Sequence, residues 1–142
     1  MKTVWKYLAC LMFAVMLVPV ASAAEREEKV VYHFSDSANA TAGLRNVRNH
    51  LDQNPKARIV VVTHGPGIDF LLDGAADKNG NPYEVLVQEL AARKVSFRVC
   101  NNTLTSRNID KSKVLPEATI VPSGVAEIGR LQTQEGYAYL KP

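Results

Sequence analysis

Apolar and polar positions along the chain follow two alternating patterns. Short apolar runs are typical of strands, and segments with an apolar residue at every third or fourth position are typical of helices. The apolar runs predict five strands, at residues 29–34, 58–64, 95–100, 118–121 and 137–140. The helical pattern predicts helices between the cap candidates at 36–39 and a stop at Asn54-Pro55, from Asn81 through Ala91, at 103–109 and at 123–135.

Particular residues mark the centre and the ends of these elements. The second strand contains the continuous apolar run 59–62, which is expected where both faces of a strand are covered, so this strand should be central. Asn81 is the predicted N-cap of the second long helix, with Glu84 placed to bond back to it. The last long helix should turn Val125, Ile128 and Leu131 inward and end at Gly136.

Strands that alternate with helices predict βαβ units, in which right-handed crossovers place helices on both faces of a mostly parallel sheet. We therefore predict an α/β fold: a single three-layer α/β/α domain with a mostly parallel five-stranded sheet. In such folds ligands bind beyond the carboxyl ends of the strands, where loops and helix N-termini converge. Candidate functional residues are therefore those that follow a strand.

The first 23 residues have the pattern of a secretory signal peptide. Lys2 and Lys6 form a basic start, residues 7–20 are apolar, and residues 21–23 are the small Ala-Ser-Ala of a cleavage site. The apolar run is shorter than the ~20 residues of a membrane span, although without cleavage it would serve as an N-terminal anchor. We expect a periplasmic or secreted protein whose domain covers residues 24–142, with no stable membrane span after cleavage.

Composition and charge exclude several classes of protein. The 142 residues are 46% hydrophobic and 22% charged, which excludes disorder, collagen and disulfide scaffolds. Removing Lys2 and Lys6 with the signal peptide lowers the net charge from +3 to +1. No basic stripe interleaved with aromatic residues is present, so we expect no nucleic-acid partner. Gly65-Pro66-Gly67 lacks the glycine pattern of a dinucleotide site and the Lys-Ser/Thr of a phosphate loop.

Cys100 is the predicted catalytic residue. Cys10 would be lost with the signal peptide, so Cys100 is the single cysteine of the mature chain and has no internal disulfide partner. It is then a buried hydrophobe, half of an intermolecular disulfide or a reactive thiol. Its strand alternates, with Val95, Phe97 and Val99 on one face and Cys100 on the other. Because a helix follows, its N–H groups would favour the thiolate.

Histidines end the first two strands, at His33 and His64. Such a histidine caps a backbone group or sits in the wall of a pocket; alternatively it is a general base for Cys100, or a copper or zinc ligand with it. The three residues lack the spacing of Cys/His metal motifs, so we expect neither metal nor cofactor. The predicted substrate-pocket residues around Cys100 are His33, His64, Gly65, Arg98 and Asn101.

Several segments resemble the DsrE/DsrF-like family of sulfur-relay proteins, to which the DsrEFH and TusBCD proteins are related. The segments are 30–33 (VVYH), 63–67 (THGPG), 97–104 (FRVCNNTL), 122–127 (PSGVAE) and 134–139 (QEGYAY). The resemblance implies a three-layer α/β/α fold, a persulfide on Cys100, homo-oligomers such as trimers or hexamers, and a protein that donates or accepts sulfur. The characterised relays are cytoplasmic, whereas this chain would be an exported member.

Three functional hypotheses follow, in this order. The first is an exported sulfur carrier, sulfurtransferase-like, with Cys100 as the persulfide site. The second is a non-catalytic oligomeric binding or assembly module, because several relatives lack the reactive cysteine. The third is a copper- or zinc-binding protein that uses Cys100 with His33 or His64.

Overall fold

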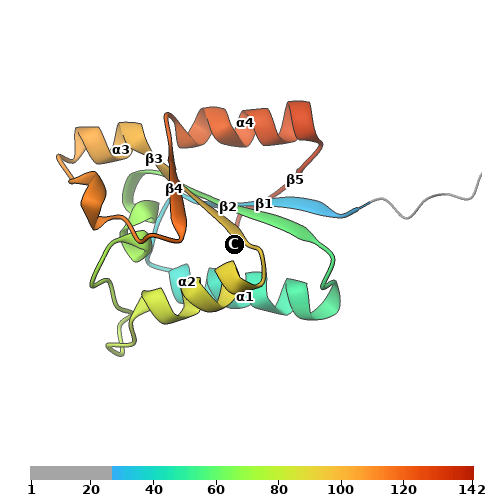
Figure 1. Ribbon diagram of the computed structural model, residues 1–142, viewed down its shortest axis with the longest axis horizontal. Coiled ribbons are helices and arrows are strands. Elements are labelled where there is room, and N and C mark those ends of the chain that lie inside the picture. Colours follow the sequence, from blue (N-terminus) through green and yellow to red (C-terminus); the bar gives the residue numbers. More distant parts are fainter. Residues whose placement is uncertain (1–26) are drawn as a thin grey trace, which may run out of the picture.

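A computed structural model of the chain describes residues 27–142 (Figure 1). The predicted signal peptide and Cys10 lie outside the described residues. None of the helices in the described part of the chain is long and apolar enough to cross a membrane.

The sheet has five strands, and every strand pair in it is parallel. Their order across the sheet is β4-β3-β2-β1-β5, so the apolar β2 is central, as its run of branched residues predicts. The strand bounds are β1 Lys29–Phe34, β2 Arg58–Thr63, β3 Ser96–Cys100, β4 Ala118–Val121 and β5 Ala138–Leu140. The predicted five-stranded α/β fold is confirmed.

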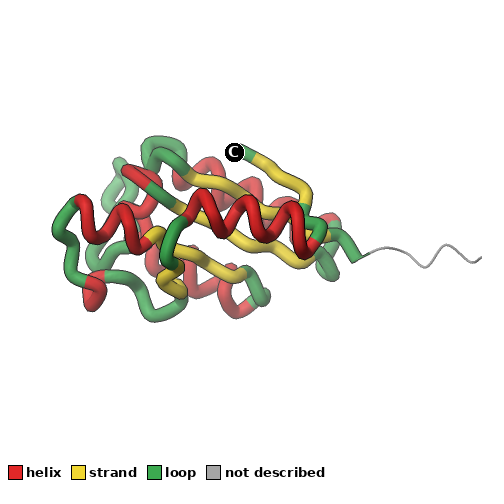
Figure 2. Tube along the Cα trace, turned by 90° about the horizontal axis from the view of Figure 1, so that it is seen from above, coloured by secondary structure: helices red, strands yellow, loops and turns green. Residues whose placement is uncertain are grey.

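Helices cover both faces of the sheet and make three layers. Helices α1 (Ala40–Gln53) and α2 (Tyr83–Ala92) lie on one face, and α4 (Gly124–Glu135) lies on the other (Figure 1). Figure 2, seen from above, shows α4 running over the strands. The short α3 (Asn101–Ser106) follows β3 directly, and two 3₁₀ segments, Gly65–Leu71 and Lys111–Lys113, lie in the connections.

Two hydrophobic clusters lie on the two sides of the sheet because side chains alternate along each strand. The larger cluster includes Tyr32, Val61 and Phe97 and packs under α1 and α2. The smaller cluster, on the α4 side, consists of Val31, Val60, Val62, Ile128, Leu131 and Tyr137. Toward the carboxyl ends of β1 and β3 the α4 side carries His33 and Cys100 instead.

The predicted N-cap of α2 is wrong by one residue. Pro82, with φ −61° and ψ 131°, is the N-cap, and no side chain caps the helix. Asn81 is held instead by Asp77, whose carboxylate accepts the Asn81 N–H at 2.9 Å and its side-chain amide at 3.1 Å. Glu84 accepts a hydrogen bond from Gln88, one turn later, rather than bonding back to Asn81. Asn81 therefore belongs to the turn that Asp77 stabilises, although the capping-box pattern assigns it to the helix.

Two further helix predictions need correction. Val125 is 64% exposed, although Ile128 and Leu131 are buried as expected. Steps of three residues fall short of a full helical turn, so Val125 lies well around the helix from Leu131. The predicted helix at 103–109 is α3, which begins two residues earlier and ends at Ser106. The predicted end of α4 is confirmed: Gly136 is left-handed, with φ 74°.

Candidate functional site

Four side chains form a row across the α4 side of the sheet, near the carboxyl ends of four adjacent strands. In strand order they are Tyr139 on β5, His33 on β1, His64 directly after β2, and Cys100 on β3. Tyr139 Oη lies 2.7 Å from His33 Nδ1. The His33 and His64 rings stack with centroids 4.7 Å apart. The two histidines thus lie at the same edge of the sheet as Cys100, as we expect for residues that follow parallel strands.

The first residue of α4 closes over this row at Gly124. A Cβ atom added there would lie 3.0 Å from the Thr63 carbonyl oxygen, 3.2 Å from Cys100 Cβ and 3.3 Å from His64 Cβ. Real Cβ atoms seldom come so close to other atoms. The absence of a side chain at Gly124 therefore allows α4 to start directly above Cys100 and His64.

Cys100 is an unpaired cysteine with only 4% of its surface exposed. Burial alone would raise the pKa of its thiol. Hydrogen bonding from the Gly124 N–H, from the Thr103 hydroxyl and from the Thr103 and Asn102 N–H groups outweighs burial, so the pKa lies below its ordinary value. The surroundings of this buried sulfur therefore favour the thiolate, the form that attacks sulfur and carbon electrophiles.

Thr103 connects Cys100 to the predicted pocket residue Gly65. Its Oγ1 accepts the Gly65 N–H at 2.9 Å, which leaves the hydroxyl proton for the sulfur. The Gly65 carbonyl in turn accepts a bond of 3.3 Å from Arg107, which also pairs with Asp69 at 2.6 Å. Gly65 thus contributes through Thr103 and not by contact with the sulfur.

His33 is half-buried and carries an unsatisfied nitrogen. Its Nε2 is buried and has no hydrogen-bond partner among the described residues. Burial, and then the nearby charges of His64 and Lys141, lower the pKa of His33. A cavity of about 290 Å³ lies beside His33 and is lined also by Phe34, Ser35, Asp36, Asn39, Lys141 and Pro142. Burial therefore favours the neutral form of His33, which faces a small polar hollow.

The two remaining predicted pocket residues are Arg98 and Asn101. Arg98 lies on the same face as Cys100, two residues earlier on β3, but it lines a different and larger cavity. Asn101 begins α3, and its Oδ1 is buried without a partner in residues 27–142. The N–H groups that favour the thiolate come from the two residues that follow it.

Neither imidazole forms a hydrogen bond to the Cys100 sulfur within the part of the chain that the structure describes. In the same residues, no group of three or more His, Cys, Asp or Glu side chains is placed to hold a metal ion. The chemistry that this arrangement supports is that of a thiolate stabilised by N–H groups and one hydroxyl.

Sequence reasoning missed two residues of the site, Gly124 and Thr103. Both lay inside noticed patterns, since Ser123-Gly124 opens a predicted helix and Thr103 ends the Asn-Asn-Thr run after Cys100. Gly124 contacts Cys100, and Thr103 contacts Gly65, across different connections between strands. Because these partners are far apart in the sequence, local sequence patterns do not predict the contacts.

Comparisons with known proteins agree with this architecture. The sequence pattern of the DsrE/DsrF-like family matches residues 17–142. The solved structure of MTH1491 from Methanobacterium thermoautotrophicum, a protein of unknown function, is 32% identical, and the match covers 82% of this chain and 100% of that chain with a TM-score of 0.73. The ychN protein from E. coli is 13% identical over 82% of this chain and 100% of its own, with a TM-score of 0.66, and is similar in fold alone. No curated protein matches the chain.

Proposed function

The chain belongs to the DsrE/DsrF-like family, which is generally linked to sulfur relay, and from this premise we propose that it carries sulfane sulfur as a persulfide on Cys100. The observation that carries the proposal is the position of Cys100 at the carboxyl edge of the sheet, between β3 and α3 and beneath Gly124, where N–H groups lower the pKa of its buried thiol. A thiolate is the form required to accept a sulfur atom.

The proposed cycle consists of two exchanges with no net oxidation. The Cys100 thiolate attacks the outer sulfur of a donor persulfide, R–S–SH. A new S–S bond forms at Cys100, the donor S–S bond breaks, and its electron pair leaves with the donor thiolate, while the proton stays on the transferred sulfur. An acceptor thiolate then attacks that outer sulfur and releases the Cys100 thiolate. This is sulfurtransferase-like chemistry and needs no cofactor.

The burial of Cys100 restricts which donors can reach it. With 4% of the residue exposed beneath the start of α4, we expect small donors such as inorganic polysulfide to react faster than bulky ones. The Gly124 N–H and the Thr103 hydroxyl would remain next to the Cys100 sulfur and stabilise it as the leaving thiolate when the outer sulfur is passed on. His64, whose Cβ lies beside the same Gly124 position as the Cys100 Cβ, would be the histidine nearer to the added sulfur atom, with His33 stacked behind it.

Mass spectrometry of the intact protein tests the proposal. The purified protein is incubated with polysulfide, separated from it and weighed, beside a Cys100→Ser variant. We expect the wild-type protein to gain one sulfur atom that dithiothreitol removes, and the variant to gain none. Equal gain by both proteins, or no gain by either, would contradict the assignment of Cys100.

Export remains part of the proposal because residues 1–23 have the pattern of a signal peptide. The sulfur donor and acceptor would then be proteins or small thiols of the periplasm or the medium. Sequencing the N-terminus of the protein recovered from cells tests this directly: a chain that begins at Ala24 supports export, and one that begins at Met1 in the cytoplasm contradicts it.

A non-catalytic assembly module is the second candidate. Apolar side chains are exposed on the outer strand β5, at Tyr139 (41%) and Leu140 (43%), and on α4 at Val125 (64%). Such residues suit contacts between copies of the chain in a trimer or hexamer. Analytical ultracentrifugation distinguishes the oligomer from a monomer. An oligomer whose native Cys100 resists small thiol reagents would favour assembly over sulfur transfer.

A further inference from the structure

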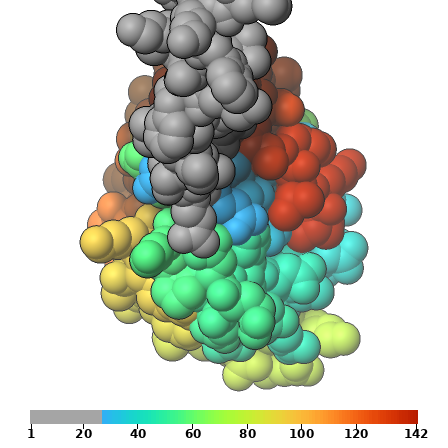
Figure 3. Space-filling model, turned by 90° about the vertical axis from the view of Figure 1, so that its right-hand side faces the viewer, coloured from blue at the N-terminus to red at the C-terminus, as the bar shows by residue number. Residues whose placement is uncertain are grey.

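A second, larger cavity lies at the opposite edge of the sheet from Cys100, at the amino-terminal ends of the strands. Its volume is about 810 Å³. Its walls come from the residues before β1, β2 and β3 and from the end of α4. Figure 3 looks onto this edge, where the start of β1 in blue, the connection before β2 in green and the end of α4 in red lie side by side. Cys100 is not among the lining residues.

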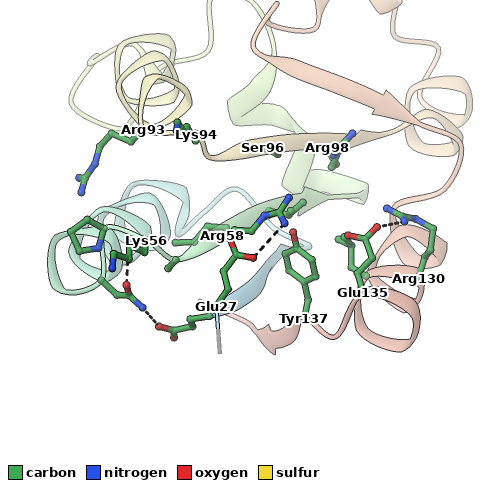
Figure 4. A pocket seen from close by; sticks show the side chains of 17 residues that line it. Glu27, Lys56, Arg58, Arg93, Lys94, Ser96, Arg98, Arg130, Glu135 and Tyr137 are labelled. Carbon is green, nitrogen blue, oxygen red and sulfur yellow. Dashed lines mark hydrogen bonds and ion pairs between the residues drawn. The ribbon is translucent and has the colours of Figure 1, made fainter. Parts of the chain in front are cut away.

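Cationic side chains outnumber carboxylates in this cavity, six to three. The carboxylates are Glu27, Glu28 and Glu135, and the cations are Lys56, Arg58, Arg93, Lys94, Arg98 and Arg130. Figure 4 shows Arg58 and Tyr137 in the middle, Lys56, Arg93 and Lys94 at one end, and Arg98 and Arg130 at the other. These charged residues come from four separate segments, and among the residues that line the cavity the cations are in excess.

Not all of these cations are neutralised by partners. Arg58 pairs with Glu27 at 3.5 Å, Arg93 with Asp52 at 2.8 Å, and Arg130 with Glu127 and Glu135. Lys56, Lys94 and Arg98 form no ion pair within residues 27–142.

Arg98 is the innermost of the unpaired cations. It is half-buried, and its Nε is fully buried with no hydrogen-bond partner among the described residues. A buried N–H without an acceptor is unfavourable, which suggests that a partner for this guanidinium comes from outside the described chain. The planar guanidinium has the geometry to hold two oxygens of one anion at once.

We propose that this cavity binds a multiply charged organic anion of the organic phosphate class, with Arg98 as its deepest contact. The excess of cations favours a ligand with more than one negative charge. The volume suits an organic molecule better than a bare ion, since ligand pockets commonly measure about 300–1,000 Å³. Ile59, Val60, Leu131 and the Tyr137 ring supply an apolar wall for its uncharged part. The site is separate from Cys100 and stands whether or not that thiol carries sulfur.

Isothermal titration calorimetry of the purified protein with adenosine triphosphate tests the proposal, with pyrophosphate and adenosine as the charged and uncharged parts alone. We expect saturable binding of the triphosphate, weaker binding of pyrophosphate and none of adenosine. Arg98→Gln should weaken triphosphate binding at least about tenfold, the effect of losing a charge-assisted hydrogen bond. Added salt should weaken it further.

Two further variants keep the test decisive. Lys56 and Lys94 are exposed at the rim, so the double variant Lys56→Gln/Lys94→Gln leaves the core intact and should also weaken binding. Arg45→Gln removes an exposed cation of α1 outside the cavity and should leave binding unchanged. Absence of binding, equal loss in the Arg45 variant, or full binding by both cavity variants would overturn the proposal.

Discussion

Gly124 and Cys100 lie so close together that a Cβ atom on Gly124 would be 3.2 Å from the Cβ of Cys100. The same added atom would be 3.0 Å from the Thr63 carbonyl oxygen, which is backbone and cannot swing away. The start of α4 and the end of β3 are therefore locked together through a position that only glycine fills without displacement.

Gly124→Ala should push the start of α4 away from Cys100. We expect a loss of about 1–3 kcal/mol in the free energy of unfolding, typical of an overpacked site, and faster alkylation of the native thiol. Gly129 is the matched control, because it lies in the same helix with open space around its Cβ position. Gly129→Ala should instead stabilise by about 0.5–1 kcal/mol. Equal effects of the two substitutions in denaturant titrations would argue against the close contact.

Thr103→Val should raise the pKa of the Cys100 thiol, because it removes a hydroxyl that favours the thiolate. The pH profile of iodoacetamide alkylation would then move to higher pH. The Gly65 N–H would also lose its acceptor, at about 1 kcal/mol in stability. Thr103→Ser keeps the hydroxyl and should restore both properties. A valine variant with an unchanged profile would show that the hydroxyl does not act on the sulfur.

Stability should depend on pH through Cys100. A thiol whose pKa is lower in the folded state contributes stability that is fully present above its unfolded value of about 8.5 and is lost as the pH falls through the folded value. The difference in free energy of unfolding between wild type and Cys100→Ala should therefore grow from about pH 6 to about pH 9. A difference that stays constant over this range would contradict the lowered pKa.

His33 should titrate below the ordinary histidine range, because burial and then the neighbouring charge of His64 lower its pKa. In a pH titration followed by imidazole proton NMR, His64→Gln should raise the His33 pKa without restoring it fully, since burial remains. His50→Gln is the control: His50 bonds to Tyr32 and Glu28 on the other face of the sheet. A His33 signal that His50→Gln moves as far as His64→Gln would rule out the stacked pair as the cause.

The hydrophobic pattern is sufficient to predict the strands of the sheet, because the alternation of apolar residues and the length of apolar runs are local properties of the sequence. The bounds of β1 and β4 agree with the apolar runs that predict them. Local signals misplaced the start of α2, where Asn81 has two competing partners. As a helix cap, Asn81 would use only its side chain. In the turn, both the backbone N–H and the side-chain amide of Asn81 donate hydrogen bonds to Asp77, and this arrangement is the one that forms.

The candidate site was predictable only in outline. That Cys100, His33 and His64 meet follows from the rule that parallel strands end at one edge. The close approach of Gly124 to Cys100 and the hydrogen bond between Thr103 and Gly65 depend on how β2, β3 and α4 pack together. Gly124 is 24 residues from Cys100 along the chain, and Thr103 is 38 residues from Gly65. No periodicity reports such contacts.

The most direct test of sulfur transfer at Cys100 is to follow one sulfur atom onto this residue and off again. The protein is loaded with polysulfide, freed of donor, digested to locate the added sulfur, and in parallel mixed with an acceptor thiol while its intact mass is recorded. We expect the extra sulfur on the peptide that contains Cys100, and its transfer to the acceptor with recovery of the free thiol. Sulfur found on no Cys100 peptide, or held there without release to the acceptor, would contradict it.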